Sequence, residues 1–463
     1  MAYVRFFTLI GFCLFCHCQP SQEVKLYTTT ADRQWLLAEQ ELTPSRPSDD
    51  TIVWEIKLDT AVRYQSIDGF GFTLTGGSAR LIYQLDSAAR AALLRELFTR
   101  EGNGIGIRYL RVSMGASDLD DQVFSYCDLP AGEVDPQLDH FNLSRDTLYL
   151  IPLLKEIRAL SPDVNLMASP WSAPAWMKTN GQAKGGSLRP EFFQAYADYF
   201  VRYVSAMQQQ GITLHAVTLQ NEPENPHNTP SMLMTAGEQA SFVKNNLGPA
   251  FQKNRITTRI VVYDHNCDHP EYPISILNDS VARKFVDGSA FHLYAGEASA
   301  MANVHAAHPD KNIYFTEQWT SAKGEFGGDL QWHARHVLIG TTQNWARTVL
   351  EWNLANDPEF GPHTDDGGCT SCLGALTIGD SITRNVSYYI IAHASRFVPP
   401  GSVRVYSNGP DSLPHVAFRT PEGKVVVIVQ TDRSSAAQVR LLVKRAVGLT
   451  LPAHSLSTVV MEN

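Results

Sequence analysis

The sequence predicts an α/β fold, a (β/α)8 TIM barrel with an attached all-β sandwich domain built from both chain ends. Over most of the chain, short apolar runs alternate with longer amphipathic stretches, as expected for βα units. Towards the C-terminus, strand-like runs alternate with turn signals and helical patterns are missing, which is typical of an all-β module. The strand-like segment 52–58 precedes the first βα unit, and we expect it to pair with that module.

Eight apolar runs are expected to form the barrel strands. They are Ser66–Gly71, Ile107–Met114, Val164–Ala168, Ala216–Leu219, Arg259–Tyr263, Ser289–Leu293, Asn312–Thr316 and Thr348–Trp352. Between them, apolar positions recur at helical spacing, for example over 87–98 and 190–204, which indicates amphipathic helices. This alternation is the pattern of a parallel barrel covered by helices.

These segments divide the chain into domains. We expect a signal peptide over 1–18, N-terminal strands of the sandwich over 24–60, the catalytic barrel over 61–396 and the C-terminal part of the sandwich over 397–463. The chain has 463 residues, of which 44% are apolar, and this agrees with two tightly joined domains and a large core.

The N-terminus predicts export. Arg5 precedes the apolar run 6–15, which is too short to span a bilayer, and this charged-then-apolar order is typical of a signal peptide. The following Cys16-His-Cys18 resembles the processing site of a bacterial lipoprotein. The exported protein is therefore expected to be periplasmic, a cell-surface lipoprotein or secreted.

Two glutamates stand where predicted barrel strands end. Glu222 follows the fourth run and Glu317 follows the seventh. In a TIM barrel the C-terminal ends of the strands form the face where active sites are assembled, and two converging carboxylates are the minimum equipment for cleaving a glycosidic bond. We therefore predict a glycoside hydrolase. Polar and aromatic residues follow the other strands and are expected to line the same pocket: Asp118, Trp171, Asn221, Asp264, His265, Asn266, His292, Tyr294, Trp319, Trp352 and Asn353.

An ordered set of motifs resembles the glucosylceramidase-like members of glycoside hydrolase family 30. The motifs are Gly69-Phe-Gly-Phe-Thr-Leu-Thr75, Leu110-Arg-Val-Ser-Met-Gly-Ala-Ser-Asp118, Ala168-Ser-Pro-Trp-Ser-Ala-Pro-Ala-Trp-Met-Lys-Thr-Asn180, Gln220-Asn-Glu-Pro223, Phe315-Thr-Glu317, Glu351-Trp-Asn-Leu-Ala355 and Ala392-His-Ala-Ser-Arg-Phe397. The resemblance implies the same barrel and sandwich and a retaining mechanism. It implies Glu222 as the acid/base and Glu317 as the nucleophile.

Other site residues are assigned from the same resemblance and from their chemistry. Asp118, Trp171, Tyr294 and Trp352 match family positions that bind the terminal glucose. A guanidinium from Arg111 near Glu317 would favour its carboxylate, and Asn221 could hold a sugar 2-hydroxyl. The family needs no metal for catalysis, so we expect no metal and no cofactor.

Some residues allow more than one interpretation. His292 is either a satisfied buried histidine or a hydrogen-bond partner of the catalytic pair. The spacing of Asp264, His265 and Asn266 admits a metal site, but their place in a sugar pocket favours hydroxyl binding. Glu224 is expected at the rim and Trp176 in packing. Cys369 and Cys372 could be a disulfide, half a metal site or two thiols, and the metal site is the least favoured because no second cysteine pair is near.

Departures from the family pattern bear on the substrate. Human-type glucosylceramidases have a cysteine where this chain has Trp319, and they lack the loop 367–374. A cysteine-paired loop after the eighth strand looks more like the bacterial and fungal β-1,6-glucanase branch. The expected substrate order is β-1,6-linked glucan, then glucosylceramide or a small β-glucoside, then β-xyloside. A hypothesis from another class is a catalytically inactive glycan-binding surface protein.

The charge of the chain limits its partners. Its 38 Lys and Arg residues and 47 Asp and Glu residues give a net charge of −9, with no basic patch to release counterions from phosphates. We expect a carbohydrate or glycolipid substrate, no nucleic acid, and membrane contact only through an N-terminal lipid anchor if a cysteine there is lipidated. The sequence gives no indication of the oligomeric state.

Overall fold

The structure is a computed structural model that describes residues 23–41, 53–443 and 446–462. The predicted signal peptide and lipoprotein-like cysteines lie outside these residues. Among the described helices, none has the length and apolar character needed to cross a membrane.

Eight parallel strands close into a barrel in the order β10-β12-β4-β5-β6-β7-β8-β9, which confirms the predicted fold class. The strands are β4 (Gly69–Leu74), β5 (Tyr109–Ser113), β6 (Asn165–Ser169), β7 (Ala216–Thr218), β8 (Arg259–Cys267), β9 (Val286–Gly296), β10 (Asn312–Glu317) and β12 (Ala346–Asn353). Each predicted run overlaps one of them. Buried side chains from the barrel strands form a cluster that fills its interior, among them Tyr109, Met167 and Tyr314.

Strand β8 runs further than its apolar run predicts. β8 continues through Asp264, His265 and Asn266, which were expected in the loop after it. Its pairing with β9 shifts register between Tyr263 and His265, and both Tyr263 and Asp264 have positive φ angles, 74° and 70°. This β-bulge lets the strand keep pairing while one extra residue is accommodated.

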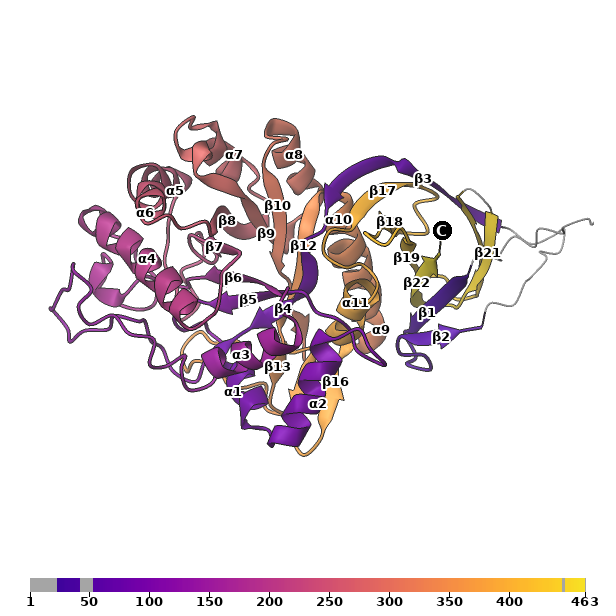
Figure 1. Cartoon of the computed structure of the whole chain (residues 1–463), viewed down its shortest axis with the longest axis horizontal. Helices are drawn as coiled ribbons and strands as arrows, with labels where there is room; N and C mark the ends of the chain where they lie inside the picture. Colours follow the sequence, from indigo (N-terminus) through magenta and orange to yellow (C-terminus); the bar gives the residue numbers. More distant parts are fainter. Residues whose placement is uncertain (1–22, 42–52, 444–445, 463) are drawn as a thin grey trace, which may run out of the picture.

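Helices cover the outside of the barrel (Figure 1). They are α1 (Gly76–Gln84), α2 (Ser87–Phe98), α3 (Leu150–Leu160), α4 (Phe193–Gln209), α5 (Ala236–Phe242), α6 (Gly248–Lys253), α7 (Glu271–Asn278), α8 (Ser299–Ala307), α9 (Phe326–Trp332), α10 (Gly340–Gln343) and α11 (Val386–Ser395). Local signals set several starts. Asp86 accepts hydrogen bonds from the amides of Ala88 and Ala89 at the start of α2, and Thr235 and Glu238 form a capping box on α5.

Both ends of the chain contribute to a nine-stranded sheet with the order β2-β1-β22-β19-β18-β17-β3-β20-β21. Its strands are β1 (Val24–Thr30), β2 (Ala38–Gln40), β3 (Val53–Ser66), β17 (Val403–Asn408), β18 (His415–Arg419), β19 (Val425–Thr431), β20 (Ala437–Leu442), β21 (Ala446–Leu451) and β22 (Ser455–Met461). β1 pairs with β22, and β3 pairs with β17 and β20. The sandwich is therefore built from both chain ends, as predicted.

The interior strand β19 is buried along its whole length. Val425, Val427 and Val429 belong to the core of the sandwich domain, whereas Val426 and Ile428 belong to the large core that includes the barrel helices. Successive side chains of a strand point to opposite faces, so this strand contributes to two cores. The two domains consequently pack as one body.

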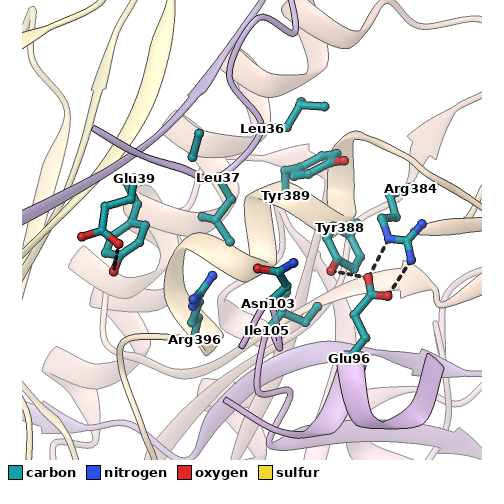
Figure 2. A pocket seen from close by; sticks show the side chains of 12 residues that line it. Leu36, Leu37, Glu39, Glu96, Asn103, Ile105, Arg384, Tyr388, Tyr389 and Arg396 are labelled. Carbon is teal, nitrogen blue, oxygen red and sulfur yellow. Dashed lines mark hydrogen bonds and ion pairs between the residues drawn. The ribbon is translucent and has the colours of Figure 1, made fainter. Parts of the chain in front are cut away.

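A cavity of about 490 Å³ lies between the N-terminal segment, α2 and α11. Figure 2 shows that, among the residues lining it, Glu96 from α2 contacts Arg384 and Tyr388 directly. The guanidinium of Arg384 contacts both carboxylate oxygens of Glu96 at 2.6 and 2.5 Å, and the Tyr388 hydroxyl donates to Glu96 at 2.6 Å. The bond from Tyr388 connects α2 to α11, and those from Arg384 connect α2 to the segment just before α11, beside the junction with the sandwich.

Two small sheets extend the loops after the barrel strands. β11 (Thr320–Ser321) pairs with β14 (Cys372–Leu373), and β13 (Ala355–Asn356) pairs with β15 (Leu376–Ile378), which pairs with β16 (Ile382–Arg384). The loop that follows β10 is thereby attached to the loop that follows β12.

Candidate active site

Glu222 and Glu317 lie side by side and are nearly buried, with exposed fractions of 7% and 5%. A carboxylate oxygen of each lies within 4.8 Å of the other. Glu317 is the last residue of β10, and Glu222 follows β7 in a left-handed conformation with φ 47°. Retaining glycosidases hold their two carboxyl groups about 5 Å apart, whereas inverting enzymes need about 6.5–9.5 Å to admit a water. The spacing here is of the first kind.

Arg111 is fully buried beneath the two carboxylates. Its guanidinium donates to Glu317 Oε2 at 2.5 Å, to Asn221 Oδ1 at 2.6 Å and to Asp264 Oδ2 at 2.8 Å. Asp264 also accepts hydrogen bonds from the hydroxyls of Thr218 and Thr316, both at 2.7 Å. Arg111 and Asp264 thus form a buried charged pair whose remaining hydrogen bonds are satisfied, which is the condition for burying such charges.

His292, on β9, joins this charged pair to both glutamates. Its Nδ1 is 3.4 Å from Glu222 Oε1 and 3.8 Å from Glu317 Oε1, and its Nε2 is 3.1 Å from Asp264 Oδ1. Burial alone would lower the pKa of His292, but the carboxylates of Glu317, Asp264 and Glu222 raise it to about 9. His292 therefore carries a proton at neutral pH, and of its two expected interpretations the geometry supports the partner of the glutamate pair.

The remaining oxygens of the pair also have donors. The hydroxyl of Tyr294 donates to Glu317 Oε1 at 2.8 Å. Glu222 Oε2 accepts from Asn225 Nδ2 at 2.7 Å and from Asn228 Nδ2 at 3.2 Å. The two asparagines were missed by the sequence reasoning because asparagines in a segment with three prolines, 223–230, look like turn chemistry. The only signal was their position three and six residues after Glu222.

The two glutamates differ in their electrostatics. Burial would raise the pKa of Glu222, but the hydrogen bond and positive charge of His292 outweigh burial and hold it at about 2. Burial raises the pKa of Glu317, although His292 and Arg111 oppose that effect. Arg111 therefore favours the Glu317 carboxylate as expected, but burial is the larger influence. The carboxylates around His292 thus favour its protonated form, and His292 in turn favours the ionised form of Glu222.

Trp171 and Trp352 stack on one another, with ring centroids 5.4 Å apart, and Arg111 lies 4.7 Å from the Trp171 ring. Their exposed fractions are only 1% and 4%. Trp319 and the sulfur atoms of Cys369 and Cys372 pack against the same cluster. Each indole thus uses one face for the stack, and Arg111 lies against Trp171. The expectation that both indoles contact the sugar stays a prediction.

Asp118 lies in the loop after β5 and is 6% exposed. Burial, with the negative charges of Glu317 and Glu222, raises its pKa to about 8. Its backbone oxygen accepts a hydrogen bond from Thr364, which belongs to the loop after β12. Asp118 is therefore close enough to the glutamates to feel their charges, and at neutral pH its carboxyl group can act as a hydrogen-bond donor.

The comparisons with known proteins agree with this geometry. The model of the glycosyl hydrolase family 30 TIM-barrel domain matches residues 67–398, and that of the family 30 beta sandwich domain matches residues 401–459. The chain belongs to glycosyl hydrolase family 30. The predicted resemblance is thereby confirmed, and the protein is a glycoside hydrolase.

Several relatives in family 30 cover most of the chain. An endo-1,6-beta-D-glucanase of Trichoderma harzianum is 32% identical over 81% of this chain and 80% of its own length. One of Neurospora crassa is 35% identical over 81% of each chain, and the lysosomal acid glucosylceramidase of Mus musculus is 30% identical over 82% of this chain and 77% of its own. Among solved structures, an endo-beta1,6-glucanase has a TM-score of 0.87 at 32% identity, covering 94% of this chain and 98% of that one. SrfJ from Salmonella typhimurium has a TM-score of 0.86 at 28% identity, covering 95% and 99%.

Of three further residues singled out in the sequence, Asp264 departs from its expected role, whereas Glu224 and Trp176 lie as expected. Asp264 was expected to bind sugar hydroxyls or a metal, but it is fully buried and its oxygens are occupied by Arg111, His292 and hydroxyl groups. Glu224 points to the surface, where it contacts His269 at 2.9 Å. Trp176 donates its indole N–H to the Cys127 carbonyl at 2.9 Å and packs edge-on against a phenylalanine, so packing is its role.

Glu222, His292 and Glu317 offer three potential metal ligands within 4.8 Å of one another. A metal ligand must be a neutral imidazole, and the raised pKa of His292 makes this ring a cation at neutral pH. Glu317 also accepts hydrogen bonds from Arg111 and Tyr294 on its two oxygens. The chemistry of these groups fits a proton shared among carboxylates better than a metal ion.

Cys369 and Cys372 are joined by a disulfide, with Cα atoms 5.7 Å apart. The bond lies in the loop after β12, whose strand β14 pairs with β11 beyond Glu317. Of the three possibilities left open by the sequence, the structure contains the disulfide. The bond fixes the loop against the aromatic cluster beside the glutamates.

Proposed function

We propose that this protein is a retaining β-glucoside hydrolase that acts by double displacement, most readily on β-1,6-linked glucan. Glu317 is the nucleophile and Glu222 the acid/base. The observation that carries this assignment is the approach of the two carboxylates to within 4.8 Å, with Arg111 and Tyr294 directed at Glu317. A carboxylate with two donors is held in one orientation, as an attacking group must be.

In the first step, a Glu317 oxygen attacks the anomeric carbon while Glu222 gives its proton to the departing glycosidic oxygen. The bond between that carbon and oxygen breaks, and a glycosyl ester forms on Glu317. Glu222 must carry a proton to act as the acid, and His292, whose Nδ1 lies 3.4 Å from Glu222 Oε1, is the group placed to supply that proton. The positive charge on His292 is then replaced by a neutral ring next to a protonated acid.

In the second step, the Glu222 carboxylate takes a proton from water, and the resulting hydroxyl attacks the anomeric carbon. The ester bond breaks and the Glu317 carboxylate is restored, so the sugar keeps its anomeric configuration. Arg111 contacts Asn221 and Glu317 together, which supports Asn221 as a holder of the sugar 2-hydroxyl beside the nucleophile.

Two observations support a β-1,6-linked glucan as substrate. The fungal relatives and the similar solved structure are named endo-1,6-glucanases. Trp319 and the disulfide pack against Trp171 and Trp352. This packing narrows the space beside Glu222 and Glu317, which suits a sugar chain better than two lipid tails. Glucosylceramide is the second candidate, favoured by the identity of 30% to the mouse glucosylceramidase.

We also propose that the protein is exported. The charged and apolar order of the N-terminus supports a signal peptide, and the disulfide between Cys369 and Cys372 is compatible with an oxidising compartment. N-terminal sequencing or mass spectrometry of the mature protein tests this, and it also distinguishes a lipidated from a soluble form. Recovery of an uncleaved N-terminus from the cell interior would contradict export.

A hydrolysis screen tests the activity. Purified protein is incubated with pustulan, laminarin, glucosylceramide and aryl β-glucosides, and pustulan is expected to give the highest kcat/KM. Mass spectrometry after incubation with a mechanism-based fluoroglucoside should show one added glycosyl group on the Glu317 peptide. A protein that binds pustulan but gains no glycosyl group and releases no sugar would instead be the glycan-binding alternative.

A further inference from the structure

We propose that Asn225 and Asn228 position the acid/base by occupying Oε2 of Glu222, so that the proton for the leaving group is carried on Oε1. The two asparagines lie in the loop after β7, outside the motifs that identified the family. They would be positioning residues, because they contact Glu222 and not the reacting atoms. The inference rests on the proposed role of Glu222 as the acid.

The orientation of the Asn225 amide is determined by its own contacts. Its Oδ1 accepts a hydrogen bond from the backbone amide of His227 at 3.0 Å, so its Nδ2 is the atom directed at Glu222 Oε2, at 2.7 Å. The backbone amide of Asn225 donates to the Glu222 carbonyl at 2.9 Å. The side chain is therefore fixed at both ends before any substrate arrives.

The second donor makes the two oxygens of Glu222 chemically different. Asn228 Nδ2 also donates to Oε2, at 3.2 Å. If Oε2 carried the carboxyl proton, that proton would point towards two N–H groups, and neither of them can accept a hydrogen bond. Oε1 instead faces His292 Nδ1, the group that supplies the proton. The proton is thereby placed on the oxygen that can exchange it with His292.

The loop that carries the asparagines is held rigidly by its neighbours. Lys178 Nζ is buried and donates to the carbonyls of Ser231 and Ala183, both at 2.7 Å. Burial lowers the pKa of Lys178 to about 7. Its Nζ also donates to the hydroxyl of Ser172, so these three hydrogen-bond acceptors are uncharged oxygens. From the other side, Thr364 Oγ1 donates to the Thr229 carbonyl at 2.8 Å. Such fixed partners are what a positioned catalytic group requires.

The test compares two leaving groups. We measure kcat/KM, which reports only the steps up to the glycosyl ester, for a methoxyphenyl β-glucoside that needs acid assistance and a dinitrophenyl β-glucoside that does not. Asn225→Ala and the isosteric Asn225→Asp should each lower kcat/KM for the methoxyphenyl substrate by about tenfold, as expected for loss of a hydrogen bond to a charged group. The value for the dinitrophenyl substrate should change by less than about twofold.

Asn180→Ala is the matched control. Asn180 lies on the neighbouring loop after β6, and its hydrogen bonds to Lys184 and Gln182 stay within that loop. This variant should leave both kcat/KM values unchanged. Asn228→Ala should reproduce the selective loss more weakly, because its bond is longer.

Equal losses on both substrates in the Asn225 variants, or no loss on either, would overturn the inference. The first result would mean that Asn225 only supports the fold of the site. A wrong assignment of Glu222 would give a different result. In that case Glu222→Ala would not lower kcat/KM more for the methoxyphenyl substrate than for the dinitrophenyl substrate. The Glu222 variant therefore separates the two ideas.

Discussion

At the scale of single residues, the division of labour between Glu222 and Glu317 gives the most direct prediction. Glu317→Gln should abolish turnover of all substrates, because no group remains to form the glycosyl ester. Glu222→Ala should lower kcat/KM by roughly 10²–10⁴-fold for a poor leaving group and leave an activated aryl glucoside largely unaffected. Azide should restore turnover of Glu222→Ala with a β-glycosyl azide as product. If azide instead rescues Glu317→Ala to a β-product, the roles are reversed.

The proton on His292 predicts a pH dependence. The reactive site needs one proton shared by His292 and Glu222, and the pKa of His292 is raised to about 9, so this proton is present at neutral pH and is lost as the pH rises through that value. kcat/KM for an aryl β-glucoside should fall above about pH 9. In His292→Gln the fall should begin at lower pH, since the ring that stores the proton is gone. An unchanged alkaline limb in that variant would show that His292 is not the reservoir.

Asp118 carries a prediction about sugar specificity. Asp118→Ala should reduce kcat/KM for aryl β-glucoside far more than for aryl β-xyloside, because a glucose has a hydroxymethyl group that xylose lacks. The expected loss on glucoside is about 3 kcal/mol, roughly a hundredfold. Equal losses on both sugars would mean that Asp118 contacts only hydroxyls they share, or supports the fold.

The sequence predicted the identity of these residues better than their contacts. Glu222 and Glu317 meet as their positions at strand ends suggested, because parallel strands of a barrel end on one face. Arg111 and His292 reach them from within β5 and β9. The inward turn of Asp264 was not foreseeable, since it depends on a bulge in which Tyr263 and Asp264 both have positive φ angles, a conformation that tyrosine rarely adopts. The stacking of Trp171 on Trp352 could not be predicted either. The sequence indicates that two rings lie near a site, but it does not indicate what their faces contact.

At the scale of elements, the loop after β12 connects most parts of the site. It supplies the disulfide beside the aromatic cluster, it donates to Asp118 through Thr364, and it is joined through β14 to the segment after Glu317. The sequence indicated this loop through its two cysteines, but its contacts with several other loops required the folded structure.

We expect Cys369→Ser to loosen this loop. The bond closes a very short ring, so the entropic stabilisation is small, about 2 kcal/mol. Chemical denaturation should show a decrease of that size in the free energy of unfolding, and kcat/KM for pustulan should fall more than that for an aryl glucoside. Labelling of the unreduced, unfolded wild-type protein with a thiol reagent should modify neither Cys369 nor Cys372. Labelling of both sulfurs would refute the disulfide.

At the scale of the whole molecule, the shared strand β19 predicts that barrel and sandwich unfold together. Ile428→Ala removes a buried side chain from the barrel side, and Val427→Ala removes one from the sandwich side. Each variant should still unfold in a single thermal transition, at a lower temperature. The free energy of unfolding should decrease by about 2–5 kcal/mol for Ile428→Ala and by less for Val427→Ala. Calorimetry that resolved two transitions, each moved by only one variant, would show that the domains are independent.

The pairing of β1 with β22 has a consequence for the synthesis of the protein on the ribosome. The strand that begins the sheet must wait for its partner until 424 further residues, those between Thr30 and Ser455, have been made (455 − 30 − 1 = 424). At synthesis rates of about 5–20 residues per second this delay lasts roughly 20–85 s. During that time the unpaired edge of β1 can pair with strands of other chains. We expect a chaperone, or the export channel, to shield this edge until synthesis is complete.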